Sequence, residues 1–237
     1  MKVGLVGYGK MGQAIEKILI DKRHTISKII NIDNTNEISE ITPENTDVVI
    51  EFTAPESALS NIKAVLGNQV PVVSGSTGWL DRYQEVVDFC NENETGFFYA
   101  SNYSLGVNIF FKLNEQLAKM MNGQGYNSSM VEIHHTQKLD SPSGTAITLA
   151  EGLIANNERK TTWVNEPTKN QSELEILSER VDQVPGTHEV TYTSDVDTIK
   201  ISHVAHSREG FAQGAVLAAE FLAGKKGVYS MNDLLNF

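Results

Sequence analysis

The sequence predicts an α/β fold over its first hundred residues, followed by a smaller α+β domain with a mainly antiparallel sheet. Three observations lead to this prediction. Short apolar runs alternate with helical patterns up to about residue 100, a glycine-rich segment follows the first run, and the alternation stops after Asn102. Strands that alternate with helices of this length imply parallel strands joined by helical crossovers.

The elements of the first domain follow from hydrophobic periodicity. Each expected strand is a short apolar run, and each expected helix has apolar residues three or four positions apart. Strands are predicted at 2–6, 26–32, 47–52, 70–73 and 97–99, and helices at 11–19, 58–66 and 83–90. We therefore expect a first domain over residues 1–103.

The second part has longer helices and alternating strands. We expect helices at 107–121, 144–154 and 211–223, a strand at 130–135, irregular chain at 156–171, and further strands near 174–176, 190–192 and 199–204. The turn at 195–197 and the alternation around it favour antiparallel pairing. We expect a second domain over 104–207, with the C-terminal segment 208–237 returning to the first domain.

Composition and charge narrow the class of protein. The 237 residues are 40% hydrophobic and 21% charged, which is ordinary for a globular protein with a core. The formal net charge of −11 argues against partners with an anionic surface. We therefore expect neither a nucleic acid nor a membrane as a partner.

Two further features predict a cytoplasmic protein. The N-terminal apolar run is too short for a signal peptide, and no stretch approaches the ~20 apolar residues of a membrane span. Cys90 is the only cysteine, which excludes an intramolecular disulfide and is typical of a reducing compartment.

The glycine-rich segment has the pattern G-x-G-x-x-G and consists of Gly7, Tyr8, Gly9, Lys10, Met11 and Gly12. It follows the first predicted strand and opens the first predicted helix, which is the position of the phosphate loop in Rossmann domains. The first glycine permits a tight turn, the second a close approach to a pyrophosphate, and the third close packing of helix on strand. Free amides at the helix N-terminus favour phosphate binding. The segment predicts an NADH or NADPH site.

Asp33 bears on the choice between the two cofactors. It follows the second predicted strand about 20 residues after the glycine segment, where an acidic residue accepts hydrogen bonds from the adenosine ribose. A carboxylate there would repel a 2′-phosphate, which favours NADH. Lys10 could offset this repulsion, and Asp33 could also be a solvated turn residue, so the preference for NADH stays open.

Two more loops follow predicted strands, at the edge where open α/β sheets bind ligands. One contains Gly75, Ser76 and Thr77, and the other contains Ala100, Ser101, Asn102 and Tyr103. Their small residues would let the nicotinamide half of the cofactor lie close to the backbone, although either loop alone could be a simple turn.

Chemically reactive residues are densest between Glu132 and Thr145. His134 and His135 are adjacent on a predicted strand, so their side chains point to opposite faces. Lys138 must lie in a curling loop if it is to share a small site with His134. Histidine can transfer a proton near neutral pH, and lysine can donate a proton or hold an anion.

A helix is predicted directly after this loop, and its N-terminus is suited to a carboxylate. Gly144 and Thr145 stand at that N-terminus. A metal site is the alternative, but adjacent histidines lack the helical i, i+4 spacing of ligands and there is no second cysteine. We therefore expect no metal.

Nearly from end to end, the sequence resembles the dihydrodipicolinate reductases (4-hydroxy-tetrahydrodipicolinate reductases) of bacterial lysine and diaminopimelate biosynthesis. The run His-His-x-x-Lys-x-Asp-x-Pro-Ser-Gly-Thr from His134 to Thr145 is the most specific part. The other matching segments are the glycine loop, 51–53 with Pro55, 75–78, 102–104, 106–108, Arg208, Phe211 and 214–215.

The resemblance implies roles for individual residues. His134 would be the catalytic proton donor or acceptor and Lys138 the proton donor, while His135 would contact the substrate. Gly144 and Thr145 would bind one of its carboxylates. Cofactor contacts would come from 7–11, Asp33, 75–77 and 100–103. The reaction implied is hydride transfer from NAD(P)H to a cyclic, unsaturated dicarboxylate, giving tetrahydrodipicolinate, by a homotetramer assembled through the sheet of the second domain.

Three departures from the family pattern affect the cofactor preference more than the reaction. The glycine loop is one residue shorter than the commoner form, which often has arginine where Lys10 stands. Many members have aspartate at the position of Glu51 and proline at that of Ser101.

Each alternative class of protein would need different residues. An aspartate or homoserine dehydrogenase would need a different substrate loop. A semialdehyde dehydrogenase would need a reactive thiol, but Cys90 lies on the apolar stripe of a predicted helix. A non-catalytic NAD(P) sensor would have no need of His134, Lys138 and Thr145 together.

Overall fold

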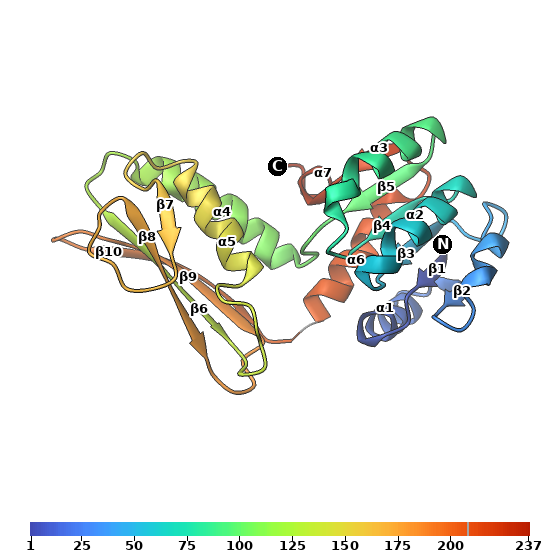
Figure 1. The fold of residues 1–237 in the computed structure, drawn as a ribbon, viewed down its shortest axis with the longest axis horizontal. Coiled ribbons are helices and arrows are strands. Elements are labelled where there is room, and N and C mark those ends of the chain that lie inside the picture. The colour runs from blue at the N-terminus through green and yellow to red at the C-terminus, as the bar shows by residue number, and fades with distance from the viewer. Residues whose placement is uncertain (208) are drawn as a thin grey trace. The chain divides into compact units, whose positions relative to one another are not determined.

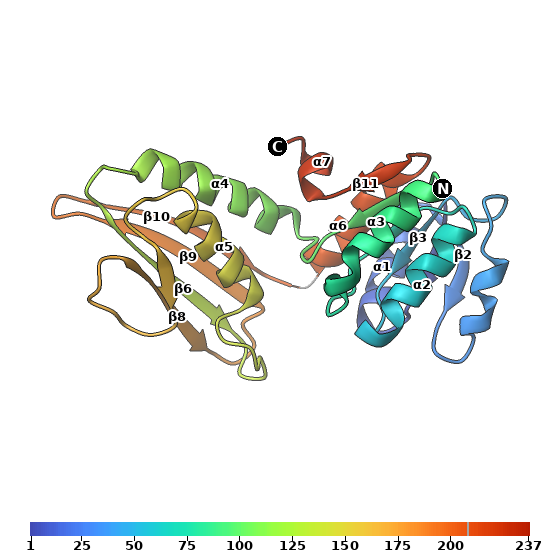
Figure 2. The same cartoon turned by 45° about the horizontal axis from the view of Figure 1, so that its top comes forward.

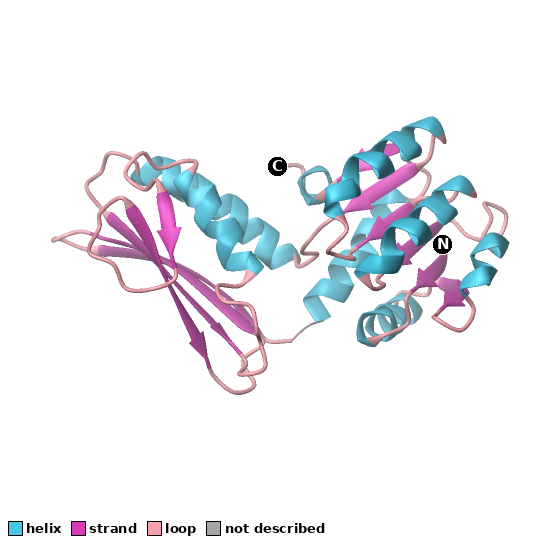
Figure 3. Cartoon of the chain, viewed as in Figure 1, coloured by secondary structure: helices cyan, strands magenta, loops and turns pink. Residues whose placement is uncertain are grey.

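The computed structural model describes residues 1–207 and 209–237, in two compact units. The first unit comprises Met1–Ser104 and Glu209–Phe237, and the second comprises Leu105–Arg208. Arg208, which the family resemblance includes, lies outside the described residues. Figures 1 and 3 show the elements of each unit along the chain.

The first unit contains a six-stranded parallel sheet in the order β11-β5-β4-β3-β1-β2. Its strands are β1 (Lys2–Val6), β2 (Thr25–Ile30), β3 (Val48–Glu51), β4 (Val72–Ser74), β5 (Gly96–Tyr99) and β11 (Gly227–Tyr229). The predicted α/β fold is thereby confirmed. The edge strand β11 was not expected, because it is only three residues long and its partner β5 is distant in sequence.

Helices cover both faces of this sheet. They are α1 (Lys10–Asp21), α2 (Pro55–Gly67), α3 (Tyr83–Glu92), α6 (Glu209–Leu222) and the short α7 (Met231–Leu235), with short 3₁₀ helices at Thr35–Glu40 and Leu80–Arg82. Successive strand residues point to opposite faces, so Val48 and Ile50 join one core with α1 and α6, while Val49 joins another with α2 and α3. The carboxyl ends of the strands are left free to carry ligand-binding loops.

The second unit has a five-stranded sheet in the order β10-β9-β6-β8-β7, with two helices packed on one face. Figure 2 shows α4 and α5 together on that face. The elements are α4 (Leu105–Met121), β6 (Asn127–His134), α5 (Gly144–Ile154), β7 (Thr162–Val164), β8 (Glu173–Arg180), β9 (Gly186–Thr193) and β10 (Thr198–Ala205).

This second sheet is mixed rather than antiparallel throughout. β9 pairs antiparallel with β6 and β10, as expected, but β8 runs parallel to both β6 and β7. The reason is the intervening helix α5, which carries the chain back to the end where β6 starts. β7 lies inside the stretch 156–171, which was expected to be irregular.

Across both units, no described helix is long and apolar enough to cross a membrane.

Candidate functional site

The glycine segment joins β1 to α1. At two of its positions, Gly7 and Gly12, there is no room for any side chain. Gly7 has a φ of +97°, and a Cβ on it would lie 1.9 Å from the carbonyl oxygen of Phe52. A Cβ on Gly12 would lie 2.3 Å from the carbonyl oxygen of Gly7. Gly9, by contrast, has open space around its missing Cβ. This is the arrangement that lets a pyrophosphate approach the backbone at the start of α1.

A cavity of about 470 Å³ opens beside this loop. Residues at the ends of three neighbouring strands and at the start of α2 line it: Val6, Gly7, Tyr8, Gly9, Ile30, Asn31, Ile32, Thr35, Phe52, Thr53, Ala54, Ser57 and Asn61. None of these lining residues is charged. The mainly apolar walls and the glycine cradle fit the adenosine half of a dinucleotide.

Asp33 stands in a turn between Ile32 and Thr35, two residues that line the cavity. The backbone N–H of Asp33 donates to Asn31 Oδ1 at 2.7 Å, and the backbone N–H of Asn31 donates to Asn34 Oδ1 at 2.7 Å. These two bonds hold the turn without using the Asp33 carboxylate, which is exposed. Lys10 is also exposed, in the first turn of α1, while Met11 is half-buried.

The loop after β4 is held by a buried carboxylate at the end of β3. Glu51 accepts hydrogen bonds from Ser74 Oγ at 2.6 Å, Ser76 Oγ at 2.7 Å and the backbone N–H of Thr53 at 3.0 Å, and another from the Thr53 hydroxyl. Burial raises the pKa of Glu51, and these donors only partly oppose the rise. Thr77 is exposed, and Gly75 lies against the Phe52 ring with no room for a Cβ.

The loop after β5 differs from the expectation in one respect. Ser101 is exposed and Asn102 half-buried, but Tyr103 is only 2% exposed and Ala100 is also buried. The Tyr103 ring packs between Phe52 and Phe98, and its hydroxyl donates to the Ser74 carbonyl at 2.6 Å. The Tyr103 side chain therefore supports the loop after β4 from within the core.

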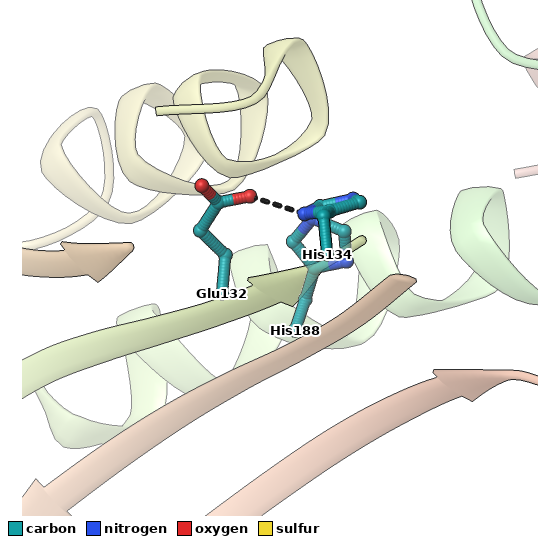
Figure 4. A group of neighbouring side chains, drawn as sticks. All are labelled: Glu132, His134 and His188. Carbon is teal, nitrogen blue, oxygen red and sulfur yellow. Dashed lines mark ion pairs between the residues drawn. The ribbon is translucent and has the colours of Figure 1, made fainter. Parts of the chain in front are cut away.

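In the second unit, a buried ion pair lies at the end of β6. Glu132 and His134 point to the same face, and Glu132 Oε2 lies 2.6 Å from His134 Nδ1 (Figure 4). The other carboxylate oxygen, Oε1, lies 3.0 Å from the Arg180 guanidinium. Burial alone would raise the pKa of Glu132, but His134, Ser178, Ser143 and Arg180 together hold it well below its usual range. Glu132 is therefore ionised at neutral pH.

His188 on β9 is the third member of this cluster. It pairs across the sheet with Glu132, and its ring centroid lies 5.1 Å from that of His134. Its Nε2 lies 3.1 Å from Ser143 Oγ, and that hydroxyl also caps α5 by accepting from the N–H of Ala146. Burial, together with the charge of His134, lowers the pKa of His188 to about 3. His188 is therefore neutral at physiological pH.

Lys138 follows in a loop after β6. β6 ends at His134, and the N–H of Lys138 turns back to the carbonyl of His135 at 3.1 Å. Lys138 Nζ lies 2.8 Å from Asp140 Oδ1. Gly144 and Thr145 begin α5, directly after its N-cap Ser143. His135 is half-buried just beyond the end of β6.

Glu132, His134 and His188 could also hold a cation. Each offers a ligand atom, and these atoms lie within 4.8 Å of one another. The guanidinium of Arg180 already balances the Glu132 carboxylate at 3.0 Å, and its charge disfavours a metal ion beside it.

Sequence reasoning gave no role to Glu132, Arg180 or His188. Glu132 could have been found, since it is two residues from His134 on a strand and so shares its face. Arg180 and His188 come from β8 and β9, and no local pattern connects them to β6. The Asn31, Thr35 and Asn61 side chains of the cavity were missed for the same reason.

Comparison with known proteins covers both units. A family model described as the N-terminus of dihydrodipicolinate reductase matches residues 1–103, and one described as its C-terminus matches 106–235. A 4-hydroxy-tetrahydrodipicolinate reductase of Christiangramia forsetii is 46% identical over all of this chain and 98% of its own length. One from Methanococcus aeolicus is 33% identical over 98% of this chain and 81% of its own.

The fold also matches solved structures. Dipicolinate-bound dihydrodipicolinate reductase from Paenisporosarcina sp. TG-14 superposes with a TM-score of 0.79 at 20% identity, covering 97% of each chain. A probable dehydrogenase from Thermotoga maritima gives a TM-score of 0.57 at 10% identity, covering 99% of this chain and 92% of its own. With both family models matched and close relatives at full length, the chain belongs to the dihydrodipicolinate reductase family of NAD(P)H-dependent oxidoreductases.

Proposed function

We propose that this enzyme reduces 4-hydroxy-tetrahydrodipicolinate to tetrahydrodipicolinate in lysine biosynthesis, with the cofactor held by the first unit and the substrate by the second. The observation that carries the proposal is the arrangement around His134. A buried histidine beside a carboxylate, a lysine loop and a helix N-terminus occur together in an otherwise acidic chain. A cyclic dicarboxylate that gains a hydride needs these three features.

Each of these features has a separate task. The N-terminus of α5 at Gly144 and Thr145 offers backbone amides to one substrate carboxylate, and His135 contacts the ring. NAD(P)H, when bound in the first unit, supplies the hydride that adds to one ring carbon. Before the reduction, the substrate hydroxyl leaves as water while a neighbouring ring carbon loses a proton, and His134 accepts that proton and returns it to the departing hydroxyl through the ring nitrogen that does not face Glu132. Lys138 then supplies the one proton that, with the hydride, completes the reduction.

The cofactor site supports NADH over NADPH. The glycine cradle fits either dinucleotide, but the cavity walls carry no cation for a 2′-phosphate, and the exposed Asp33 carboxylate lies in the turn between Ile32 and Thr35. β2 contains one lysine, Lys28, whose ammonium already pairs with the carboxylates of Glu37 and Glu40 at 2.6 and 2.5 Å. Among the described residues of the glycine segment, Lys10 is the cation that could favour NADPH. Exchange of Asp33 for serine should then narrow the difference between the two cofactors.

The subunits of this enzyme form a homotetramer through the sheet of the second unit. The sheet face opposite α4 and α5 carries Val131 and Ile133 of β6 and Leu177 of β8, which are only half-buried in the single chain. A second copy would cover them. Light scattering on the purified protein should give four times the mass of one chain.

The cytoplasm is the compartment that a single, reduced cysteine fits.

The test is a coupled assay. A synthase generates the substrate from pyruvate and aspartate semialdehyde, and the loss of NADH or NADPH absorbance is followed. Oxidation that depends on this substrate supports the proposal, and the ratio of the two rates measures the cofactor preference. Protein that binds NADH but never oxidises it would be a sensor or a different reductase, and the proposal would fail.

A further inference from the structure

Arg180 contacts both the carboxylate beside His134 and the backbone of the loop that carries Lys138. His134 and Lys138 are the two residues that the proposed reaction uses for proton transfer. Arg180 is the last residue of β8 and pairs in register with His134 of β6. Its guanidinium lies 3.0 Å from Glu132 Oε1 and donates at 2.7 Å to the carbonyl of Asp140. Its Nε donates at 3.4 Å to the carbonyl of Lys138 itself.

Through these contacts, the rigid guanidinium of Arg180 can act on His134 and on the loop of Lys138 at the same time. Through Glu132, the guanidinium fixes the carboxylate that faces His134 Nδ1. Through the two carbonyls, it holds the loop that carries Lys138, and Asp140 in that loop contacts the Lys138 ammonium at 2.8 Å. The planar, five-donor fork of arginine can satisfy a carboxylate and two carbonyls at once, which a lysine ammonium on a flexible stem cannot do in the same geometry.

Burial of Glu132 makes the positive charge of the guanidinium stabilising at this place. The Glu132 side chain is 0% exposed, and an uncompensated buried carboxylate is strongly destabilising. The loop from His135 to Ser143 has exposed residues on both sides of Lys138 and contributes no strand pairing of its own. Arg180 thus ties the part of this loop around Lys138 to the strand end beside it, while Ser141 and Ser143 hold the later part through Asn165 and His188.

We propose that Arg180 is a positioning residue that sets His134 and Lys138 in one arrangement for the reduction. This inference rests on the proposed function, because the positions of two proton-transfer groups matter only if the reaction takes place. Misplacing a reacting group by about 1 Å can lower a rate about 100-fold. Loss of the fork should therefore lower kcat and leave NADH binding, which belongs to the first unit, unchanged.

The experiment compares Arg180→Lys with Arg159→Lys in the coupled assay. Arg159 is a matched control in the same unit: its guanidinium also bridges two backbone carbonyls, those of Gly125 and Tyr126 at 3.2 Å, but beside the start of β6. We expect Arg180→Lys to lower kcat about 10- to 100-fold with an unchanged KM for NADH. Arg159→Lys should retain the wild-type kcat.

A spectroscopic measurement separates positioning from a general loss of structure. The ring nitrogen signals of His134, assigned by comparison with His134→Gln, should shift in Arg180→Lys and stay unchanged in Arg159→Lys. If Arg180→Lys does not fold by circular dichroism, Glu132→Gln decides the matter, because it removes the carboxylate at the centre of the same connection. It should lower kcat to a similar extent.

Each outcome has one meaning. An active wild type with a folded Arg180→Lys variant that keeps full kcat, or with a Glu132→Gln variant that keeps full kcat where Arg180→Lys does not fold, would overturn the positioning role and leave the reductase assignment intact. A wild type that binds NADH but never oxidises it with substrate would overturn the proposed function, and the role of Arg180 with it.

Discussion

Gly186 of β9 lies so close to His134 that a Cβ on Gly186 would stand 3.0 Å from His134 Nε2. The opposite ring nitrogen, Nδ1, lies 2.6 Å from Glu132. The ring therefore has little room to move, and Nε2 is the nitrogen that the proposed proton transfer would use.

Gly186→Ala should displace the His134 ring by a few tenths of an ångström and lower kcat several-fold, about 10-fold at most. Steady-state kinetics with NADH measures the effect. Gly152→Ala is the control. Gly152 lies inside α5, and its Cβ would meet the Glu115 side chain of α4 at 3.5 Å, an ordinary contact distance. Gly152→Ala should keep kcat and gain about 0.5–1 kcal/mol in stability. Unchanged kcat in Gly186→Ala would show that His134 has more room than the structure gives it.

Lys138→Ala should lose most of the turnover number while NADH binding survives, because it removes the proposed proton donor from the second unit only. Single-turnover kinetics and fluorescence titration with NADH measure the two effects. Lys169→Ala, at an exposed lysine of the same unit, should behave as wild type. Retained turnover in Lys138→Ala would remove this residue from the mechanism.

His188 should make stability depend on pH between about 6.5 and 3. Its pKa is lowered from 6.5 to about 3 in the folded protein, chiefly by burial and next by the charge of His134, while the Glu132 carboxylate partly opposes the decrease. The unfolded chain therefore binds the proton first as pH falls, so stability is greatest above pH 6.5 and decreases below it. The slope from this one group is at most about 1.4 kcal/mol per pH unit.

Urea unfolding at pH 7.5 and pH 5 measures this slope. In that interval Glu132 stays ionised, because its carboxyl pKa is held well below its usual range. His188→Gln keeps a polar group near Ser143 and should lose less stability between the two pH values than wild type. Equal losses in both proteins would show that His188 titrates normally.

Cys90→Ala should keep full activity, and thiol reagents should leave the native enzyme active. Cys90 is fully buried in α3, donates to the carbonyl of Thr95 at 3.2 Å, and its pKa is raised to about 11 by burial. Rates before and after treatment with iodoacetamide give the comparison. Inactivation on the timescale of an exposed thiol would reopen thioester chemistry.

Glu51→Asp should raise the KM for NADH several-fold with a smaller effect on kcat. The shorter side chain cannot reach Ser74 and Ser76 together, so the loop at Gly75–Thr77 loses its support at the end of β3. Initial rates at varied NADH measure the change. Glu85→Asp, on the exposed surface of α3, is the control for loss of one methylene. A wild-type KM in Glu51→Asp would confine Glu51 to a role in folding.

The sequence by itself determined the elements whose signals are local. The glycine segment, the turn at Asp33 and the run from His134 to Thr145 each lie within a few residues, so backbone sterics and side-chain spacing were sufficient to predict the α/β fold and to nominate His134 and Lys138. The burial of Cys90 followed in the same way from one helical stripe.

Only the tertiary structure decided which residues surround His134. Arg180 and His188 reach it because β8 and β9 pair with β6 in one register, and pairing between distant segments leaves no periodic trace in either segment. The parallel direction of β8 and the edge strand β11 depend on the same long-range pairing. Burial then sets the charge states: the low pKa values of Glu132 and His188 arise from neighbours that the chain brings together only when it is folded.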